Sequence, residues 1–220
     1  MTPIELPPSS AETTAAARAE AQRNRILDAA QRCFVASGFH AAAVSGIAVE
    51  AGISQGLMYR YFENKRAMIL ALIERQLRAD QRSIGKMSAS SDLVDALLGC
   101  YQIWARGESI SRHDTAIASV ALYAEITAEA QRDPMVAEVL RRHDKLTTDG
   151  ICTWLRQHDQ ARGVAIDEAA LQQRTLLFRI TVEGLAMRAV RDPDLPPDTV
   201  RWLLRHAVTA VIGDGDFAPK

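Results

Sequence analysis

Apolar residues recur every three to four positions along almost the whole chain, and this period constrains the fold more than any other feature of the sequence. In residues 18–37, one stripe of this kind is formed by Ile26, Leu27, Ala30, Phe34 and Val35. Residues with this spacing share one face of an α-helix, whereas a half-buried strand alternates apolar and polar residues. No segment alternates in that way. The pattern therefore predicts an all-α fold.

Turn and capping residues divide the pattern into about nine helices. Gly38 and Gly163 suit helix ends, whereas Asp133 and Asp167 suit helix starts. The expected helices cover residues 18–37, 44–51, 54–62, 63–86, 92–107, 114–131, 134–161, 167–191 and 197–212. A chain of 220 residues is long enough for one domain or two small ones.

Composition limits the class and the compartment. The chain is 48% hydrophobic and 24% charged, which is typical of globular proteins. The three cysteines lie far apart, which favours small core residues over disulfides or zinc. Residues 1–17 contain three prolines and lack the basic and apolar regions of a signal peptide, so we expect a flexible leader. No run of 18 apolar residues occurs, so we expect a cytoplasmic protein without a membrane span.

Residues 44–62 have the layout of a helix-turn-helix. Ile47, Ala48 and Ala51 give the first short helix a small inward face. Gly52 supplies the backbone conformation that a tight turn needs, where a Cβ would be costly. Two short helices in a bundle would look similar, so the side chains of the second helix decide between the two interpretations.

The second helix of this motif presents side chains that suit DNA. Ser54 can cap it by accepting a backbone N–H. Its expected anchors are Leu57, Met58 and Phe62, and its expected outward residues are Gln55, Gly56, Tyr59, Arg60 and Tyr61. Gln can read a base edge, Tyr can bind phosphate oxygens, and Gly allows the backbone to approach closely. This set favours DNA binding over an ordinary bundle.

The distribution of charge supports the same interpretation. The net charge of −1 looks unfavourable for binding a polyanion. However, residues 18–86 contain 11 Lys and Arg against 6 Asp and Glu, whereas residues 87–220 contain 15 against 19. One end of the chain is therefore basic and the rest is acidic, as expected when only one end meets phosphates.

The sequence resembles the TetR family of bacterial transcriptional regulators over about its first 70 residues. The resemblance is carried by residues 25–30 with Phe34, Gly38 and Phe39, then by residues 47–48, 50–54 and 56–62 and by Lys65. The helical remainder is similar to the family in architecture. Residues 162–163, 183–185 and 191–193 are most similar to the BetI-like regulators.

The resemblance implies a ligand-responsive regulator, most often a repressor, that binds a palindromic operator as a homodimer. It implies a three-helix DNA-binding domain over residues 18–66 and a larger ligand-binding and dimerisation domain over residues 67–220. The implied DNA contacts are Ser45, Ser54, Gln55, Gly56, Leu57, Tyr59, Arg60, Tyr61 and Lys65. Many members have Thr or Ser before the first helix of the motif, where this chain has Ala42 and Ala43. We therefore expect that helix to lack an N-cap, with Ser45 as a partial replacement.

The last two expected helices carry apolar stripes that suit a four-helix dimer interface. The expected interface residues are Leu176, Ile180, Gly184, Met187, Leu203, Leu204, Ala207, Val208 and Val211. Burial inside one subunit is the alternative. An effector of unknown identity is expected near the aromatic residues Tyr101, Trp104, Tyr123, Trp154 and Phe178, although aromatic residues at helical spacing are more often core. Candidate polar partners are Glu125, Arg179 and Glu183.

An enzyme has little support. The five histidines, His40, His113, His143, His158 and His206, do not pair at helical spacing, and no phosphate or nucleophile motif occurs. We therefore expect no catalytic residue, no metal and no cofactor. The second hypothesis is a helical ligand- or partner-binding module with weak or lost DNA binding, and Ala42 and Ala43 are its best support.

Overall fold

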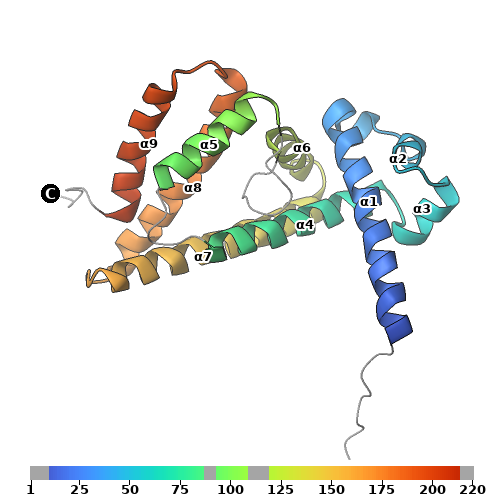
Figure 1. Ribbon diagram of the computed structural model, residues 1–220, viewed down its shortest axis with the longest axis horizontal. Coiled ribbons are helices and arrows are strands. Elements are labelled where there is room, and N and C mark those ends of the chain that lie inside the picture. The colour runs from blue at the N-terminus through green and yellow to red at the C-terminus, as the bar shows by residue number, and fades with distance from the viewer. Residues whose placement is uncertain (1–9, 87–92, 109–118, 214–220) are drawn as a thin grey trace, which may run out of the picture. The chain divides into compact units, whose positions relative to one another are not determined.

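Nine α-helices and no strand occur in the part of the chain that the computed structural model describes, residues 10–86, 93–108 and 119–213 (Figure 1). This confirms the all-α prediction. The helices are α1 Ser10–Ala41, α2 Val44–Glu50, α3 Gln55–Tyr61, α4 Lys65–Lys86, α5 Leu93–Ala105, α6 Val120–Ala130, α7 Pro134–Ala161, α8 Glu168–Arg191 and α9 Pro197–Ile212. The chain divides into two units, residues 1–72 and 73–220, and α4 continues from the first into the second.

In the first unit α2 packs against α1 and α3 packs against α2, and Lys65 at the start of α4 contacts the end of α1. Its fully buried side chains include Ile26 and Phe34 of α1, Ile47 of α2 and Met58 of α3. Gly38 has φ 77° and ψ 163°, so α1 bends there before it ends at Ala41. The predicted stop at Gly38 therefore marks a real break in the helix, three residues before the end.

The N-terminal end of α1 differs from the prediction. The helix begins at Ser10, so residues 10–17 are helical rather than part of a flexible leader. Alanine has the highest helix propensity, and residues 15–17 are an unbroken alanine run that continues into Arg18. Residues 1–9 of the predicted leader lie outside the described residues.

The second unit has a core of apolar side chains from α5, α7, α8 and α9, with Val120 of α6. Its helix starts follow the predicted caps. The Asp133 carboxylate accepts from the N–H of Met135 at 2.9 Å, and the Asp167 carboxylate accepts from the N–H of Ala169 at 2.9 Å. The bounds of α7 and α9 match the prediction. The predicted starts at 92 and 114 lie outside the described residues.

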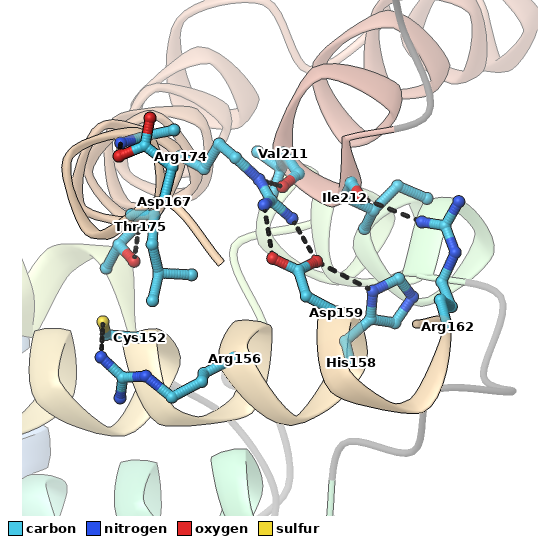
Figure 2. Close-up of polar contacts among 12 residues, drawn as sticks. Cys152, Arg156, His158, Asp159, Arg162, Asp167, Arg174, Thr175, Val211 and Ile212 are labelled. Carbon is cyan, nitrogen blue, oxygen red and sulfur yellow. Dashed lines mark hydrogen bonds and ion pairs between the residues drawn. The ribbon is translucent and has the colours of Figure 1, made fainter. Parts of the chain in front are cut away.

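Polar contacts, most of them partly buried, fasten the C-terminal end of α9 to α7 and α8 (Figure 2). Arg174 of α8 makes two hydrogen bonds to the Asp159 carboxylate of α7, at 2.7 and 2.9 Å. The same guanidinium donates to the carbonyl of Val211 at 2.6 Å, and Arg162 donates to the carbonyl of Ile212 at 3.1 Å. The last carbonyls of a helix have no partner within the helix, so these arginines satisfy two of them. We call this set of five residues the α9 clamp.

Candidate DNA-binding and effector sites

The turn between α2 and α3 has the geometry of a helix-turn-helix. Gly52 has φ 64°, which is the left-handed conformation that the sequence predicted for this turn. The N–H of Ile53 donates to the carbonyl of Ala48 at 3.0 Å and closes the turn. The hydroxyl of Ser54 accepts from the N–H of Leu57 at 3.2 Å, which confirms the predicted N-cap.

Helix α3 is held by one face and presents the other to solvent. Met58 and Phe62 are buried, as predicted from their spacing. Leu57 and Tyr61 are half-buried. The exposed residues of this segment are Ser54, Gln55, Gly56, Tyr59 and Arg60. A Cβ built on Gly56 would meet nothing within 4 Å, so this side of α3 is open to a close approach.

The ammonium of Lys65 is engaged within the first unit. It donates to the carbonyl of His40 at 3.0 Å and to that of Ala42 at 3.3 Å. An ammonium has three N–H donors, and two of them bind the last turn of α1 and the residue that follows this helix. Lys65 therefore holds the backbone that leads from α1 into the helix-turn-helix. Sequence reasoning missed this role because the partners of Lys65 are more than 20 residues away.

The start of α2 confirms the predicted absence of an N-cap. Ala43 occupies the cap position and offers no side-chain acceptor. Ser45 is exposed on the first turn of α2, and no cap from it is seen. At the other end of this helix, Arg32 of α1 binds the Glu50 carboxylate at 2.6 Å, which ties α2 to α1.

The five predicted effector residues belong to the core of the second unit. Tyr101, Trp104, Trp154 and Phe178 are buried, and Tyr123 is half-buried against the same cluster. The rings of Trp154 and Phe178 lie 6.4 Å apart. The hydroxyl of Tyr101 donates to the carbonyl of Asp192. Most of these aromatic side chains therefore stabilise the packing of the unit, as the alternative interpretation had it.

A polar cluster next to Tyr123, formed by side chains of α7 and α8, combines the half-buried Arg179 and Glu183 with the exposed Asp144. Arg179 binds both Asp144 of α7 and, at 2.9 Å, Glu183 of its own helix. Burial raises the pKa of Glu183, and Asp144 adds to that rise while Arg179 opposes it. Burial and the Glu183 charge raise the pKa of the Tyr123 hydroxyl. Sequence reasoning singled out Arg179 and Glu183 but missed Asp144, which lies on another helix without any spacing signal. The third predicted polar partner, Glu125, is half-buried on α6.

Apolar side chains are exposed along α8 and α9. Leu176 and Ile180 of α8 are 58% and 57% exposed, and Trp202 and Leu203 of α9 are 59% and 51% exposed. Gly184 is also exposed on α8. Trp202 was missed by sequence reasoning; it lies beside Leu203 and its ring is 4.1 Å from that of His206.

Part of the predicted interface is corrected by burial. Leu204, Val208 and Val211 of α9 are buried in the core of their own unit, so these side chains have no surface to offer to a partner. Met187 and Ala207 are half-buried. The apolar stripe of α9 is therefore divided between the core and the exposed face.

Neither a metal centre nor a membrane span is found in the described residues. No group of three or more His, Cys, Asp or Glu side chains within the described ranges could hold a metal ion. None of the helices described here is both long enough and apolar enough to cross a bilayer.

The helix-turn-helix and the separate helical second unit define a class of DNA-binding transcriptional regulators. Residues 26–72 match the family model described as bacterial regulatory proteins, tetR family. The HTH-type transcriptional regulator UidR of Escherichia coli (strain K12) is 30% identical over 169 residues, which cover 76% of this chain and 82% of UidR. The chain belongs to the TetR family, whose members are ligand-responsive DNA-binding regulators.

Two further relatives support this placement. The HTH-type transcriptional repressor AcnR of Corynebacterium diphtheriae is 27% identical over 137 residues, which cover 62% of this chain and 65% of AcnR. The solved structure of Salmonella enterica GusR is 26% identical, with a TM-score of 0.66, and the match covers 87% of this chain and 95% of GusR. The finer resemblance to BetI-like regulators stays a prediction.

Proposed function

We propose that this TetR-family regulator is a repressor that binds a palindromic operator as a homodimer and is released by a small molecule. One observation carries the DNA-binding part. Helix α3 is anchored by buried Met58 and leaves Gln55, Tyr59 and Arg60 exposed, at the end of a capped helix-turn-helix. The related AcnR is named a repressor, which supports the direction of regulation. A regulator of chromosomal DNA acts in the bacterial cytoplasm.

In this proposal, residues 18–66 read DNA and residues 67–220 bind the effector and the second subunit. Gln55, near the start of α3, contacts a base edge in the major groove, for which a glutamine can make two hydrogen bonds to adenine. Tyr59, Arg60 and Tyr61 contact phosphates. Ser54 and Gly56 lie where the backbone meets the DNA, with Leu57 beside them and Ser45 at the start of α2.

The dimer forms, we propose, through the exposed apolar face of α8 and α9. Leu176, Ile180 and Leu203 are each more than half exposed, and burying such side chains contributes about 25 cal/mol per Å² of apolar surface. Exposed Gly184 permits close approach of two copies of α8. A two-fold axis through this face gives two reading heads and hence a palindromic operator.

The effector site is proposed in the second unit at the polar cluster of Tyr123, Asp144, Arg179 and Glu183, next to the aromatic core. Tyr123, Arg179 and Glu183 are half-buried, and half-buried ionisable groups beside apolar walls are typical of ligand sites. The cluster supplies a guanidinium, a carboxylate whose pKa is raised and a phenol. These groups suit an effector with both donors and acceptors.

Selection of bound duplexes from random DNA, followed by fluorescence anisotropy at several salt concentrations, tests the DNA-binding part. We expect a palindromic consensus and an affinity that falls steeply with salt because phosphate contacts release counterions. Tyr59→Ala should weaken binding to all sequences, whereas Gln55→Ala should relax the preference at one base by about 1–3 kcal/mol. Arg141→Ala on α7 is the control, because its side chain is 70% exposed and lies in the second unit.

The alternative is a module that binds a ligand or partner but has lost DNA binding. The uncapped start of α2 at Ala43 favours it, since a missing N-cap costs about 1 kcal/mol of helix stability. This alternative predicts no enriched sequence in the selection and no effect of Tyr59→Ala. That result would contradict the repressor proposal even if a small molecule binds the second unit tightly.

A further inference from the structure

The polar cluster around Arg179 contains more acid than base. The Arg179 guanidinium binds the carboxylates of both Asp144 and Glu183. One guanidinium balances one carboxylate, so the three side chains together have one negative charge when both acids are ionised. The pKa of the Tyr123 hydroxyl responds to the same three charges: burial raises it most, Glu183 and Asp144 raise it further, and Arg179 opposes them. A carboxylate left without its own cation in a half-buried site favours a cation as the next partner.

Helix α6, which packs against α7 and α8, adds acid to this side of the second unit. It contains Glu125 and Glu129 but neither lysine nor arginine. Both glutamates are half-buried, and Glu129 lies 3.8 Å from the guanidinium of the exposed Arg132. An anionic ligand would approach the cluster against these charges, whereas a cation is attracted by them. The charges of α6 therefore favour the same class of ligand as the cluster itself.

Thr147 of α7 has a buried hydroxyl without a hydrogen-bond partner in the described part of the chain. Its residue is 1% exposed. Thr175 of α8 is equally buried, but its hydroxyl donates to the carbonyl of Leu171 at 2.8 Å. Thr127 and Thr181 make the same bond within their own helices, and so does Thr153. A buried polar group that lacks a partner costs free energy, so the unpaired hydroxyl of Thr147 calls for an explanation.

The position of Thr147 supplies that explanation. Residues three apart share a side of a helix, and helical side chains lean toward its N-terminus, so the Thr147 hydroxyl lies toward the turn that carries Asp144. Two turns further along α7, the ring of Trp154 lies 6.4 Å from that of Phe178. This side of α7 thus presents an exposed carboxylate, a buried hydroxyl and a buried aromatic ring in succession. Such an order suits a ligand with a polar head and an apolar body.

We infer that this polar cluster binds an organic cation, with its ammonium group held by Asp144, Glu183 and the hydroxyl of Thr147. The ammonium donates hydrogen bonds to the three oxygens, and its charge balances the cluster. The apolar body packs against the aromatic side chains, and the ring of Tyr123 attracts the cation through its face. The inference rests on the proposed function and deepens it, because it specifies the charge of the ligand at the proposed effector site.

The test uses the full chain without DNA and three sets of probes, each with one apolar body and three end groups. The sets are phenethylamine, phenethyl alcohol and phenylpropionate; tryptamine, tryptophol and indolepropionate; and hexylamine, hexanol and heptanoate. Thermal unfolding and isothermal titration calorimetry measure binding. In at least one set the amine should raise the melting temperature and bind at least about tenfold more tightly than the carboxylate.

Two charge variants locate the site. Asp144→Asn combined with Glu183→Gln leaves the guanidinium of Arg179 as the single charge of the cluster, so this double variant should prefer the carboxylate probe to the amine. Asp149→Asn is the matched control, because Asp149 lies on the same helix and is 58% exposed, against 57% for Asp144. The control should retain the preference of the parent for the amine.

A hydroxyl variant separates a ligand contact from a structural role. Thr147→Val keeps the shape of the side chain and removes a buried group that lacks a partner, so the unliganded protein should melt no lower than the parent. Binding of the amine should weaken about tenfold, because a hydrogen bond to a charged group is lost. Thr175→Val removes a paired hydroxyl and should lower the melting temperature without changing the affinity. A structural role for Thr147 would give the result expected for Thr175.

The outcomes distinguish this inference from the proposed function. The inference is overturned if no amine binds, if the carboxylates bind as tightly as the amines, or if the double charge variant keeps the parent preference. Anisotropy with the selected duplex then tests release. Amines that bind at the cluster but leave DNA affinity unchanged would contradict the proposed release and leave the inference intact. An anionic compound that releases the duplex equally from the parent and from the double charge variant would overturn the inference and leave the proposed function standing.

Discussion

Replacing Arg174 by methionine tests whether the α9 clamp holds the second unit together (Figure 2). The Asp159 side chain is 4% exposed and that of Arg174 is 17% exposed, so this ion pair is well shielded from water. The methionine fills much of the same volume but removes two hydrogen bonds to Asp159 and one to the carbonyl of Val211. The variant leaves a buried carboxylate without its cation.

The expected cost follows from this burial. Removing one partner of a buried, hydrogen-bonded ion pair costs about 3–5 kcal/mol, whereas an exposed pair contributes about 0.2–1 kcal/mol. The double variant Arg174→Met with Asp159→Leu replaces the pair by apolar side chains. Such replacements are often neutral or stabilising, so the double variant should be more stable than Arg174→Met alone.

Urea unfolding at one fixed protomer concentration measures these differences, because the stability of a dimer depends on concentration. Hydrogen exchange of the α9 amides reports whether that helix loosens first. The hydrogen bonds from Arg174 hold the pKa of Asp159 below its usual value of 3.8. Their stabilisation is therefore present above pH 3.8 and is lost as the pH falls through the folded pKa, and Arg174→Met should lack this acid-dependent loss. A cost of less than about 1 kcal/mol for Arg174→Met would refute the reasoning, because it would equal that of a solvent-exposed pair.

Three further predictions concern the helix-turn-helix, the polar cluster around Arg179 and the exposed apolar face of α8 and α9. Ser54→Ala should lower the free energy of unfolding by about 1 kcal/mol in thermal melting, because it removes the acceptor for the N–H of Leu57. Ser54→Asp should restore that acceptor and the stability. Equal stability of Ser54→Ala and the parent would contradict the cap. Burial raises the pKa of Glu183 above 4.5, so the parent should lose stability as pH rises from 4.5 through the folded pKa. Glu183→Gln should be free of that loss in melting curves taken at several pH values. Leu203→Glu should convert a dimer to a monomer in analytical ultracentrifugation while Met135→Glu, an equally exposed site on α7, does not; a dimeric Leu203→Glu would place the interface elsewhere.

Local signals in the sequence predicted the helices well. Helix α7 begins after Asp133 and α9 begins at Pro197, because a capping carboxylate and a proline in the first turn each mark a start by themselves. The start of α1 was placed too late, since the prolines before residue 9 suggested a leader and the alanine run was given too little weight.

The apolar stripe of α9 shows where periodicity stops being informative. It identified one apolar side that contains both Leu203 and Leu204. In the structure Leu204 is buried in its own unit, whereas its neighbour Leu203 is half exposed. An apolar stripe indicates that one side of a helix avoids water. It does not indicate what covers that side, because this depends on the positions of α5, α7 and α8, which no pattern within α9 encodes.

Polar contacts between distant residues were the hardest to predict. Arg174 and Asp159 lie 15 residues apart on two helices, and Lys65 binds carbonyls more than 20 residues earlier. Arginines and aspartates on exposed helices are common, so only the packing of the helices identifies the pair. The exposed side of α3 was predictable because its anchors, its cap and its exposed residues all lie within nine positions, 54–62.

Residues 18–72 are more basic than the net charge of −1 for the whole chain suggests. Residues 18–72 contain seven Lys and Arg against four Asp and Glu. Of these cations, Arg32 is paired with Glu50 and Lys65 binds backbone carbonyls. Three of the seven lie in the first part of α1, at positions 18, 23 and 25. Arg60 is exposed on α3 and contacts phosphate in the proposed function. Because so few cations lie in this part of the chain, and because each phosphate contact adds about 0.9 to the salt slope, Arg60→Ala alone should lower that slope measurably in the proposed dimer, which carries the residue twice.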